Sequence, residues 1–117
     1  MPLIVIHNIG DDFRLKTTNF VQGLKRTVAE IHELQISMDG VTVSFNYGTA
    51  DINDQTVIVI VELLFDKTER TIEVRQRLAQ QIGLYISEGL KSFGRPRKVE
   101  VAVKKFNPDK DAFVVLE

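Results

Sequence analysis

The residue with the most distinctive potential chemistry is Pro2, which follows the initiating methionine directly. Methionine before a small residue is usually removed, and proline would then carry a secondary amine, whereas an internal proline is a non-basic amide. An α-amino group titrates near about pH 8, and desolvation or nearby cations lower its pKa toward the range where a general base works best. The alternative is that Pro2 only begins a strand, where its missing N–H does no harm.

Several charged side chains could contribute to a site. Glu62 interrupts an apolar segment, and a buried carboxylate needs a partner. It could pair with a cation, donate a proton, or reach solvent at a strand end. Arg70, Arg75 and Arg77 form either an anion clamp or the solvated face of a helix. The basic cluster at 95–98 is either an anion site or a solvated loop.

Metal and cofactor chemistry has no support in the sequence. The chain contains no cysteine, which excludes disulfides, thiol catalysis and thiolate metal sites. His7 and His32 lie far apart without carboxylates at ligand spacing, so we expect no metal site. We expect a hydrogen-bonded structural role for His7 and a solvent-facing position for His32. The glycines are scattered, which excludes a phosphate-binding loop, and we expect no cofactor.

The elements that must position these residues alternate between strand and helix. Residues 3–6 are consecutive aliphatics, as in a strand buried on both faces. Asp11 and Asp12 offer an N-cap, and apolar residues at helical spacing then run over 13–34. Residues 41–47 alternate with period two, which predicts a strand with one wet face.

The second half repeats this pattern. Residues 57–65 form another two-faced apolar strand, and Asp66 with Glu69 resembles a capping box that opens a second helix. Gly94 and Pro96 end that helix. Residues 99–104 alternate as a one-faced strand, and 111–116 read as a short final strand.

The predicted fold is therefore α+β and occupies one domain, 1–117. Duplicated β-α-β halves at about 1–50 and 57–106 form a four-stranded mixed sheet with two helices on one face, plus the C-terminal strand at 111–116. Two right-handed crossovers place both helices on the same face. The other face remains aliphatic over 2–7 and 57–65, and such a surface should not stay in water. We therefore expect a homo-oligomer.

Composition limits the possible partners and the compartment. The chain has 117 residues, of which 44% are hydrophobic and 26% charged, as in a globular domain. Its 15 Lys and Arg balance 16 Asp and Glu, which argues against nucleic acid as a partner. No apolar run approaches about 18 residues, and the N-terminus lacks a charged leader and a cleavage site. We expect a cytoplasmic protein without a membrane partner.

The sequence resembles the tautomerase superfamily. The resemblance lies in the initial Met-Pro, the aliphatic strand after it, the duplicated β-α-β pattern without cysteine, the length and the short terminal strand. Members include 4-oxalocrotonate tautomerase (4-OT), 5-carboxymethyl-2-hydroxymuconate isomerase and macrophage migration inhibitory factor. Residues 61–65, the helix after them and 111–113 are most similar to a small bacterial branch. The resemblance implies a homotrimer whose sheets line a central barrel.

The resemblance also implies roles for individual residues. Pro2 would take a proton from a carbon beside a carbonyl or from a dienol of a small-molecule substrate. Lys67, with Arg70 nearby, corresponds to an arginine that binds a substrate carboxylate, and Phe113 corresponds to an aromatic residue of the pocket. Glu62 is added as a substrate-binding candidate.

Three positions depart from the family pattern. In the first half, the arginine position falls near Asp12, with Arg14 two residues on. A second arginine lies early in the closing strand of the family, and Thr42 and Glu100 stand at these places. That carboxylate clamp is therefore absent, which disfavours the standard dicarboxylate substrates.

Two hypotheses for function remain. The first is a tautomerase-like isomerase with Pro2 as base, acting on a small keto or enol acid. The second is a non-catalytic oligomeric module for ligand binding or protein interaction, with a ferredoxin-like or tautomerase fold. In the ferredoxin arrangement the second and third strands pair, whereas in the tautomerase arrangement the first and third pair centrally and the second lies at an edge. The aliphatic central strands disfavour an RNA-binding version, which would present aromatics there.

Overall fold

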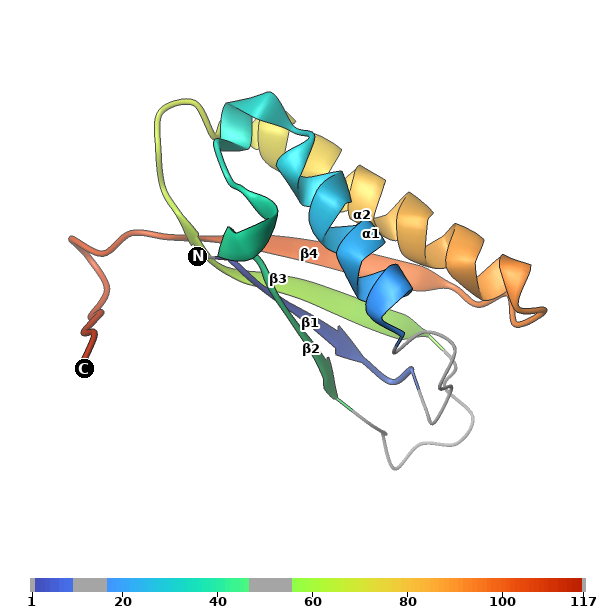
Figure 1. Ribbon diagram of the computed structural model, residues 1–117. Coiled ribbons are helices and arrows are strands. Elements are labelled where there is room, and N and C mark those ends of the chain that lie inside the picture. The colour runs from blue at the N-terminus through green and yellow to red at the C-terminus, as the bar shows by residue number, and fades with distance from the viewer. Residues whose placement is uncertain (1, 10–16, 47–55, 117) are drawn as a thin grey trace.

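The computed structural model describes residues 2–9, 17–46 and 56–116. In this part of the chain, one face of a four-stranded sheet is covered by two helices (Figure 1). Two short 3-10 helices connect α1 to β2. The elements are β1 (Leu3–His7), α1 (Thr18–Ala29), the 3-10 helices η2 (His32–Leu34) and η3 (Met38–Gly40), β2 (Thr42–Asn46), β3 (Val57–Phe65), α2 (Ile72–Ser92) and β4 (Val99–Phe106).

The strands lie in the order β2-β1-β3-β4. β1 is parallel to β2 and β3 is parallel to β4, while the central pair β1 and β3 is antiparallel. Val5 thus lies opposite Ser44 on one side and Ile60 on the other. This confirms the predicted α+β fold of two β-α-β units. The second strand pairs with the first and not with the third, so the ferredoxin-like arrangement is wrong.

The core lies between the sheet and the helices. Alternate residues of β1 and β3, such as Ile4, Ile6 and Val59, are fully buried on the helix side. An apolar stripe with a spacing of four residues along α2 forms the opposing layer, and all of its residues are buried. These are Val74, Leu78, Ile82, Ile86 and Leu90.

Both helices begin at a threonine N-cap. The hydroxyl of Thr17 accepts a hydrogen bond from the Phe20 amide (3.2 Å), and that of Thr71 accepts one from the Val74 amide (3.3 Å). The predicted capping box of Asp66 and Glu69 is wrong, because these residues belong to the preceding turn, where the Arg70 amide donates to the Lys67 carbonyl (2.9 Å). The predicted cap at Asp11 and Asp12 lies outside the described residues.

The structure confirms the predicted end of α2 and corrects the predicted end of α1. α2 ends at Ser92, and Gly94 follows at φ 73°, as the predicted stop at Gly94 and Pro96 requires. α1 ends at Ala29, so the prediction that helix continues to Leu34 is wrong. The chain instead forms η2, which ends where Gln35 adopts a left-handed conformation.

The predicted C-terminal strand at 111–116 is also wrong for a single copy of the chain. These residues belong to no strand, and the segment leaves the sheet after β4 (Figure 1). A strand needs a neighbouring edge for its backbone hydrogen bonds, and β4 is followed by a turn at Asn107–Asp111 that directs the chain away from its own strand.

The sheet face opposite the helices is uncovered in the single chain. Leu3, Val5 and Ile60 of the central strands are only half-buried there, and Ile58 is exposed. The edge strands present polar residues on this face, for example Ser44. Within the described helices, no stretch is both long and apolar enough to cross a bilayer.

Candidate functional site

Pro2 is a buried residue at the N-terminal end of β1. Its carbonyl oxygen accepts a hydrogen bond from the amide of Thr42 (3.1 Å), which fixes the start of β1 against β2. The next residue, Leu3, lines a pocket on the uncovered side of the sheet. Pro2 therefore lies beside a cavity and not in bulk solvent. Met1 lies outside the described residues.

This pocket has a volume of about 460 Å³, and almost all of its wall is apolar. It joins the start of β1, the start of β2, the end of β3 and the C-terminal segment. The lining residues are Leu3, Thr42, Leu63, Phe65, Phe113 and Val115.

A bulge in β3 shapes the pocket. Leu63 has φ 57°, and the pairing of β3 with β4 shifts register between Val61 and Leu64. Leu64 stays in the core while its neighbours Leu63 and Phe65 line the pocket. A non-glycine residue in this conformation costs roughly 1–3 kcal/mol, and such strain concentrates at functional sites. The sequence signal at this place is the interruption of the apolar segment by Glu62.

An aromatic cluster holds the C-terminal segment at the pocket. The ring of Phe113 lies edge-on to Phe65 and to Phe106, with centroid distances of 5.2 and 5.8 Å. Phe65 and Phe106 are 5.6 Å apart on neighbouring strands. Phe113, which the sequence placed in the pocket only by resemblance, is thus brought to the same cavity as Leu3.

The candidates Glu62 and Lys67 lie in different surroundings. Glu62 is half-exposed, and its carboxylate lies 3.8 Å from the ammonium of Lys104. Of the alternatives for Glu62, the structure favours a partly solvated ion pair. Lys67 is exposed and lines a separate, polar pocket of about 450 Å³ at the turn between β3 and α2.

Arg70 has a structural position. Its side chain is 7% exposed, and burial lowers the pKa of its guanidinium. Nε and Nη2 donate to the carbonyl of Leu34 (3.2 and 2.7 Å), and Nη1 donates to the carbonyl of Phe65 (2.8 Å). Arg70 thereby ties η2 to the end of β3. These donors face backbone carbonyls, so we leave Arg70 out of the proposed substrate contacts.

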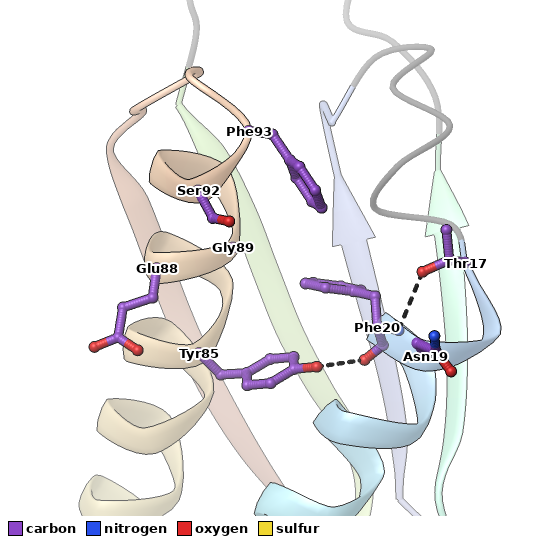
Figure 2. A pocket seen from close by; sticks show the side chains of 8 residues that line it. All are labelled: Thr17, Asn19, Phe20, Tyr85, Glu88, Gly89, Ser92 and Phe93. Atoms are coloured by element: carbon purple, nitrogen blue, oxygen red, sulfur yellow. Dashed lines mark hydrogen bonds between the residues drawn. The ribbon is translucent and has the colours of Figure 1, made fainter.

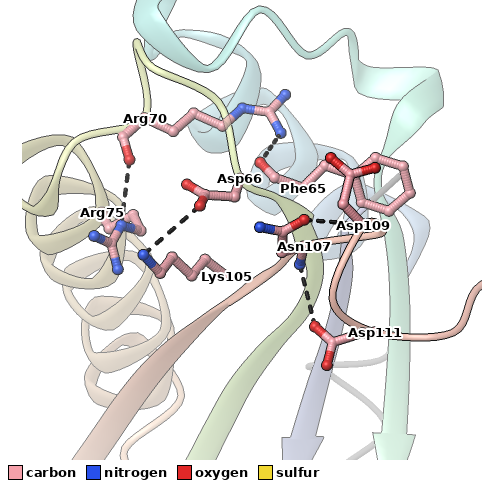
Figure 3. A network of polar contacts seen from close by, with 8 residues as sticks. All are labelled: Phe65, Asp66, Arg70, Arg75, Lys105, Asn107, Asp109 and Asp111. Carbon is pink, nitrogen blue, oxygen red and sulfur yellow. Dashed lines mark hydrogen bonds and ion pairs between the residues drawn. The ribbon is translucent and has the colours of Figure 1, made fainter.

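A polar network surrounds Arg70 (Figure 3). Nε of Arg75 donates to the Arg70 carbonyl (3.3 Å), and the ammonium of Lys105 lies 3.7 Å from the Asp66 carboxylate. These contacts hold the turn after β3 against α2 and β4. Arg77 forms an ion pair with Glu33, and both side chains are about half-exposed. The arginines of α2 are thus used in contacts within the chain or on its surface.

The two histidines follow the predictions. Nδ1 of His7 lies 3.1 Å from the side-chain amide nitrogen of Asn46 and accepts its hydrogen bond, which links the ends of β1 and β2. His32 is exposed in η2. Among the described residues, no group of three or more His, Asp and Glu side chains could hold a metal ion.

A second pocket, of about 570 Å³, lies between the start of α1 and the end of α2 (Figure 2). The hydroxyl of Tyr85 donates to the Phe20 carbonyl (2.8 Å), and burial raises the pKa of Tyr85. Because α1 follows β1 along the chain, this pocket lies at the end of the sheet away from Pro2. The lining residues are Thr17, Asn19, Phe20, Tyr85, Glu88, Gly89, Ser92 and Phe93.

Known structures share this architecture over nearly the whole chain. A structure described as "F6 fused 4-OT wild type asymmetric trimer" has a TM-score of 0.66 at 15% identity and covers 96% of this chain and 91% of its own. FG41 malonate semialdehyde decarboxylase inhibited by 3-bromopropiolate has a TM-score of 0.55 at 18% identity, with 98% and 89% covered. Macrophage migration inhibitory factor of Toxoplasma gondii has a TM-score of 0.56 at 11% identity, with 96% and 94% covered.

Sequence comparison adds nothing to this result, because no protein family and no curated protein matches the chain. The structural likenesses, at 11–18% identity, concern the fold. They agree with the order of strands and with the two helices on one face. The resemblance predicted from the sequence is confirmed at this level, and the chain has the tautomerase fold.

Proposed function

We propose that the protein is a cytoplasmic tautomerase-type isomerase in which Pro2 is the general base. The observation that supports this most directly is the position of Pro2. It is buried at the start of β1, next to Leu3 and bonded through its carbonyl to Thr42, and both of these residues line the apolar pocket. The role requires removal of Met1, which turns the nitrogen of Pro2 from an amide into a secondary amine.

The proposed step is a proton transfer beside a carbonyl. The lone pair of the Pro2 nitrogen takes a proton from the carbon next to the carbonyl, and the C–H electrons form the C=C bond of an enolate. The ammonium then returns the proton to the enolate oxygen, so no other reactant is consumed. An apolar wall lowers the pKa of the amine below about 8 and keeps more of it neutral at pH 7.

The substrate we propose is a small keto or enol acid with an apolar group. Leu63, Phe65 and Phe113 would contact that group in the pocket. Lys67, at the neighbouring turn, would attract the carboxylate, and Glu62 beside Lys104 would bind a polar group of the substrate. The wall offers few polar contacts, which favours one carboxylate over two.

We also propose that the protein is a homotrimer. A trimer would cover the aliphatic residues that β1 and β3 leave half-buried on the uncovered face, including Leu3, Val5 and Ile60. Burial of apolar surface is the main favourable term in such association. The similar fused 4-OT structures are described as trimers.

The test of the base begins with the intact mass of the natural protein. Loss of Met1 is expected, and retention would exclude Pro2 as a base. Phenylpyruvate and 2-hydroxymuconate are then assayed with the wild type and with Pro2→Ala. We expect kcat/KM to fall by about a hundredfold or more, the usual contribution of a general base. Unchanged turnover contradicts the proposal.

A matched control separates chemistry from folding. Pro108 is an exposed proline in the turn after β4, and Pro108→Ala should leave turnover unchanged. Because Pro2 is buried, the melting temperatures of both variants are measured. A loss of activity in Pro2→Ala with a near-native melting temperature supports the catalytic role.

The second candidate is a tautomerase fold that binds ligands without catalysis. It is favoured by Thr42 and Glu100 at the places of the second arginine and by the engagement of Arg70 with backbone carbonyls. This hypothesis predicts that protein with a verified N-terminal proline binds apolar acids in the pocket but leaves their enolisation rate at that of buffer. Turnover that depends on Pro2 excludes it.

A further inference from the structure

The pocket between the start of α1 and the end of α2 has the size and the wall of a small-molecule site (Figure 2). Its volume of about 570 Å³ lies within the range of about 300–1,000 Å³ that is usual for ligand pockets. Three aromatic side chains, those of Phe20, Tyr85 and Phe93, line it. Aromatic walls with a few polar groups among them are typical of sites for small organic ligands.

The inner end of the pocket is closed where the two helices touch. The side chain of Tyr85 crosses from α2 to α1, where its hydroxyl donates to the Phe20 carbonyl (2.8 Å). The centroids of the Tyr85 and Phe20 rings are 5.1 Å apart. Both rings are thus held in place before a ligand arrives, which lowers the entropy cost of binding.

Short polar side chains border the pocket on its solvent side. Thr17 and Ser92 are exposed there and carry hydroxyl groups, and Asn19 adds an amide. In Figure 2 the Ser92 hydroxyl points into the space between the two helices. A serine hydroxyl both donates and accepts hydrogen bonds, so it suits a hydroxyl group of a ligand.

The charge at the pocket disfavours acids. Among the described residues that line it, Glu88 is the one charged side chain. Glu88 is exposed, and its carboxylate is directed away from the rings in Figure 2. An acid bound among the rings would have no lining cation to pair with, and an unpaired charge is costly to bury. The pocket therefore fits an uncharged ligand better than the acids of the proposed reaction.

The pocket also lies apart from the proposed catalytic residue and the proposed interface. Its lining residues come from the two helices and their ends, at the end of the sheet away from Pro2. The proposed trimer covers the opposite face of the sheet, which leaves the helix layer open to solvent (Figure 1). A ligand can therefore enter this pocket in the assembled protein without blocking Pro2.

We infer that this pocket is a second binding site, which takes a small uncharged aromatic alcohol. The ring of the ligand packs against Phe20, Tyr85 and Phe93, and its hydroxyl forms a hydrogen bond with Ser92. The bound ligand contacts both helices and holds the start of α1 to the end of α2. The inference does not depend on Pro2 being a base.

The first test compares two probes that differ in charge. 2-Phenylethanol and phenylacetate share a ring and a two-carbon chain, and each is titrated while the fluorescence of Tyr85 is followed. The chain has no tryptophan and two tyrosines, so Tyr47→Phe leaves Tyr85 as the single emitter. We expect saturation by 2-phenylethanol with a Kd of about 1 mM or below, and binding of phenylacetate that is about tenfold weaker or more. Equal affinities, or no saturation by the alcohol, would overturn the inference.

A blocking variant locates the bound probe. Ser92→Phe places a ring at the mouth of the pocket and should weaken binding of 2-phenylethanol about tenfold or more. Ser37→Phe makes the same change at an exposed serine outside the pocket and should leave the Kd unchanged. The melting temperatures of both variants are measured to establish that they fold. Undiminished binding in Ser92→Phe would show that the probe lies elsewhere.

Amide chemical shifts of the wild type give a second location that needs no variant. Addition of 2-phenylethanol should shift the signals of Phe20 and Gly89, which line this pocket. The signals of Leu3 and Leu63, which line the apolar pocket near Pro2, should stay unchanged. Shifts confined to Leu3 and Leu63 would assign the probe to the other pocket and overturn the inference.

Turnover separates this site from the proposed reaction. Pro2→Ala should bind 2-phenylethanol with the wild-type Kd, and Ser92→Phe should keep the wild-type turnover of phenylpyruvate. An inactive wild type that still binds the alcohol would contradict the proposed function and leave the second site standing. If Ser92→Phe lost turnover at a native melting temperature, the pocket would belong to the reaction, and the inference of a separate site would be wrong.

Discussion

The two β-α-β halves share a plan but differ in length, and the difference lies at the candidate site. β1 has five residues and α1 has 12, whereas β3 has nine and α2 has 21. The pairing of β1 with β3 reaches Leu3 and Glu62 and goes no further. The last residues of β3, 63–65, therefore extend beyond the start of β1.

This overhang forms much of the pocket. Leu63 and Phe65 lie in it, and together with the C-terminal segment they build the wall next to Pro2. A symmetric duplication would end β3 level with β1 and leave that terminus beside an open sheet end. The shared plan thus accounts for the sheet and the core, and the asymmetry of the second half accounts for the cavity.

The largest effect is expected where the two halves are tied together, at Arg70. Arg70→Met removes the donors to the carbonyls of Leu34, in the first half, and Phe65, in the second. Each buried carbonyl left without a partner costs about 1–3 kcal/mol. We expect the free energy of unfolding in urea to fall by about 3 kcal/mol at fixed protein concentration.

Arg77→Met is the matched control for Arg70→Met. Arg77 forms its ion pair with Glu33 at the surface, and exposed pairs contribute about 1 kcal/mol or less. Equal losses of unfolding free energy in the two variants would show that Arg70 contributes no more than a surface charge. The conclusion that Arg70 ties the two halves together would then be wrong.

An intermediate effect is expected where the helices of the two halves touch. A Cβ at Gly23 of α1 would lie 2.0 Å from the hydroxyl oxygen of Tyr85 in α2. Gly23→Ala must displace that ring and break its hydrogen bond to Phe20. Overpacking costs about 1–3 kcal/mol, and alanine returns up to about 1 kcal/mol of helix propensity. We expect a net loss of about 1–2 kcal/mol by thermal or urea unfolding.

Gly83, a glycine of α2, provides the control for Gly23→Ala. A Cβ at Gly83 would lie 3.3 Å from Val101 of β4, so Gly83→Ala should stay within about 0.5 kcal/mol of the wild type. Tyr85→Phe removes the atom closest to Gly23, so Gly23→Ala should cost less in that background. An undiminished cost in the double variant would refute the steric explanation.

The sequence predicted the fold better than the site. The continuous apolar run over 57–65 located β3 to the residue, because a central strand of a sheet has little contact with water. The bulge at Leu63 lay beyond this method, since it appears only when β3 is paired with β4. The residue types of the C-terminal segment predict a strand, but strand formation also needs a hydrogen-bonding partner, and none of the strands of the same chain pairs with this segment.

Charged candidates were harder to predict than apolar ones. The sequence predicts either a substrate contact or a solvated helix face for Arg70, because it does not show that the guanidinium reaches the carbonyl of Leu34 in a distant segment. The sequence leaves open whether Glu62 pairs with a cation or reaches solvent, because the answer depends on Lys104 of the neighbouring strand. Long side chains make contacts that are set by tertiary structure and not by local spacing.

The smallest effects are expected at the helix starts, where the two halves are most alike. Thr17→Ala and Thr71→Ala each remove a side-chain acceptor for the amide three residues on, and each should cost about 1 kcal/mol in unfolding free energy. Serine at either position should restore most of the loss. Amide hydrogen exchange should quicken at Phe20 in the first variant and at Val74 in the second.

Asp66→Ala tests whether α2 is capped by Thr71 or by the capping box of Asp66 and Glu69 that the sequence predicts. Asp66 lies in the turn before Thr71 and pairs only loosely with Lys105, at 3.7 Å. Its removal should therefore change the free energy of unfolding by less than Thr71→Ala does and leave exchange at Val74 unaltered. If instead Asp66→Ala frayed α2 and Thr71→Ala did not, the helix would begin at the capping box, and the two halves would start their helices by different means.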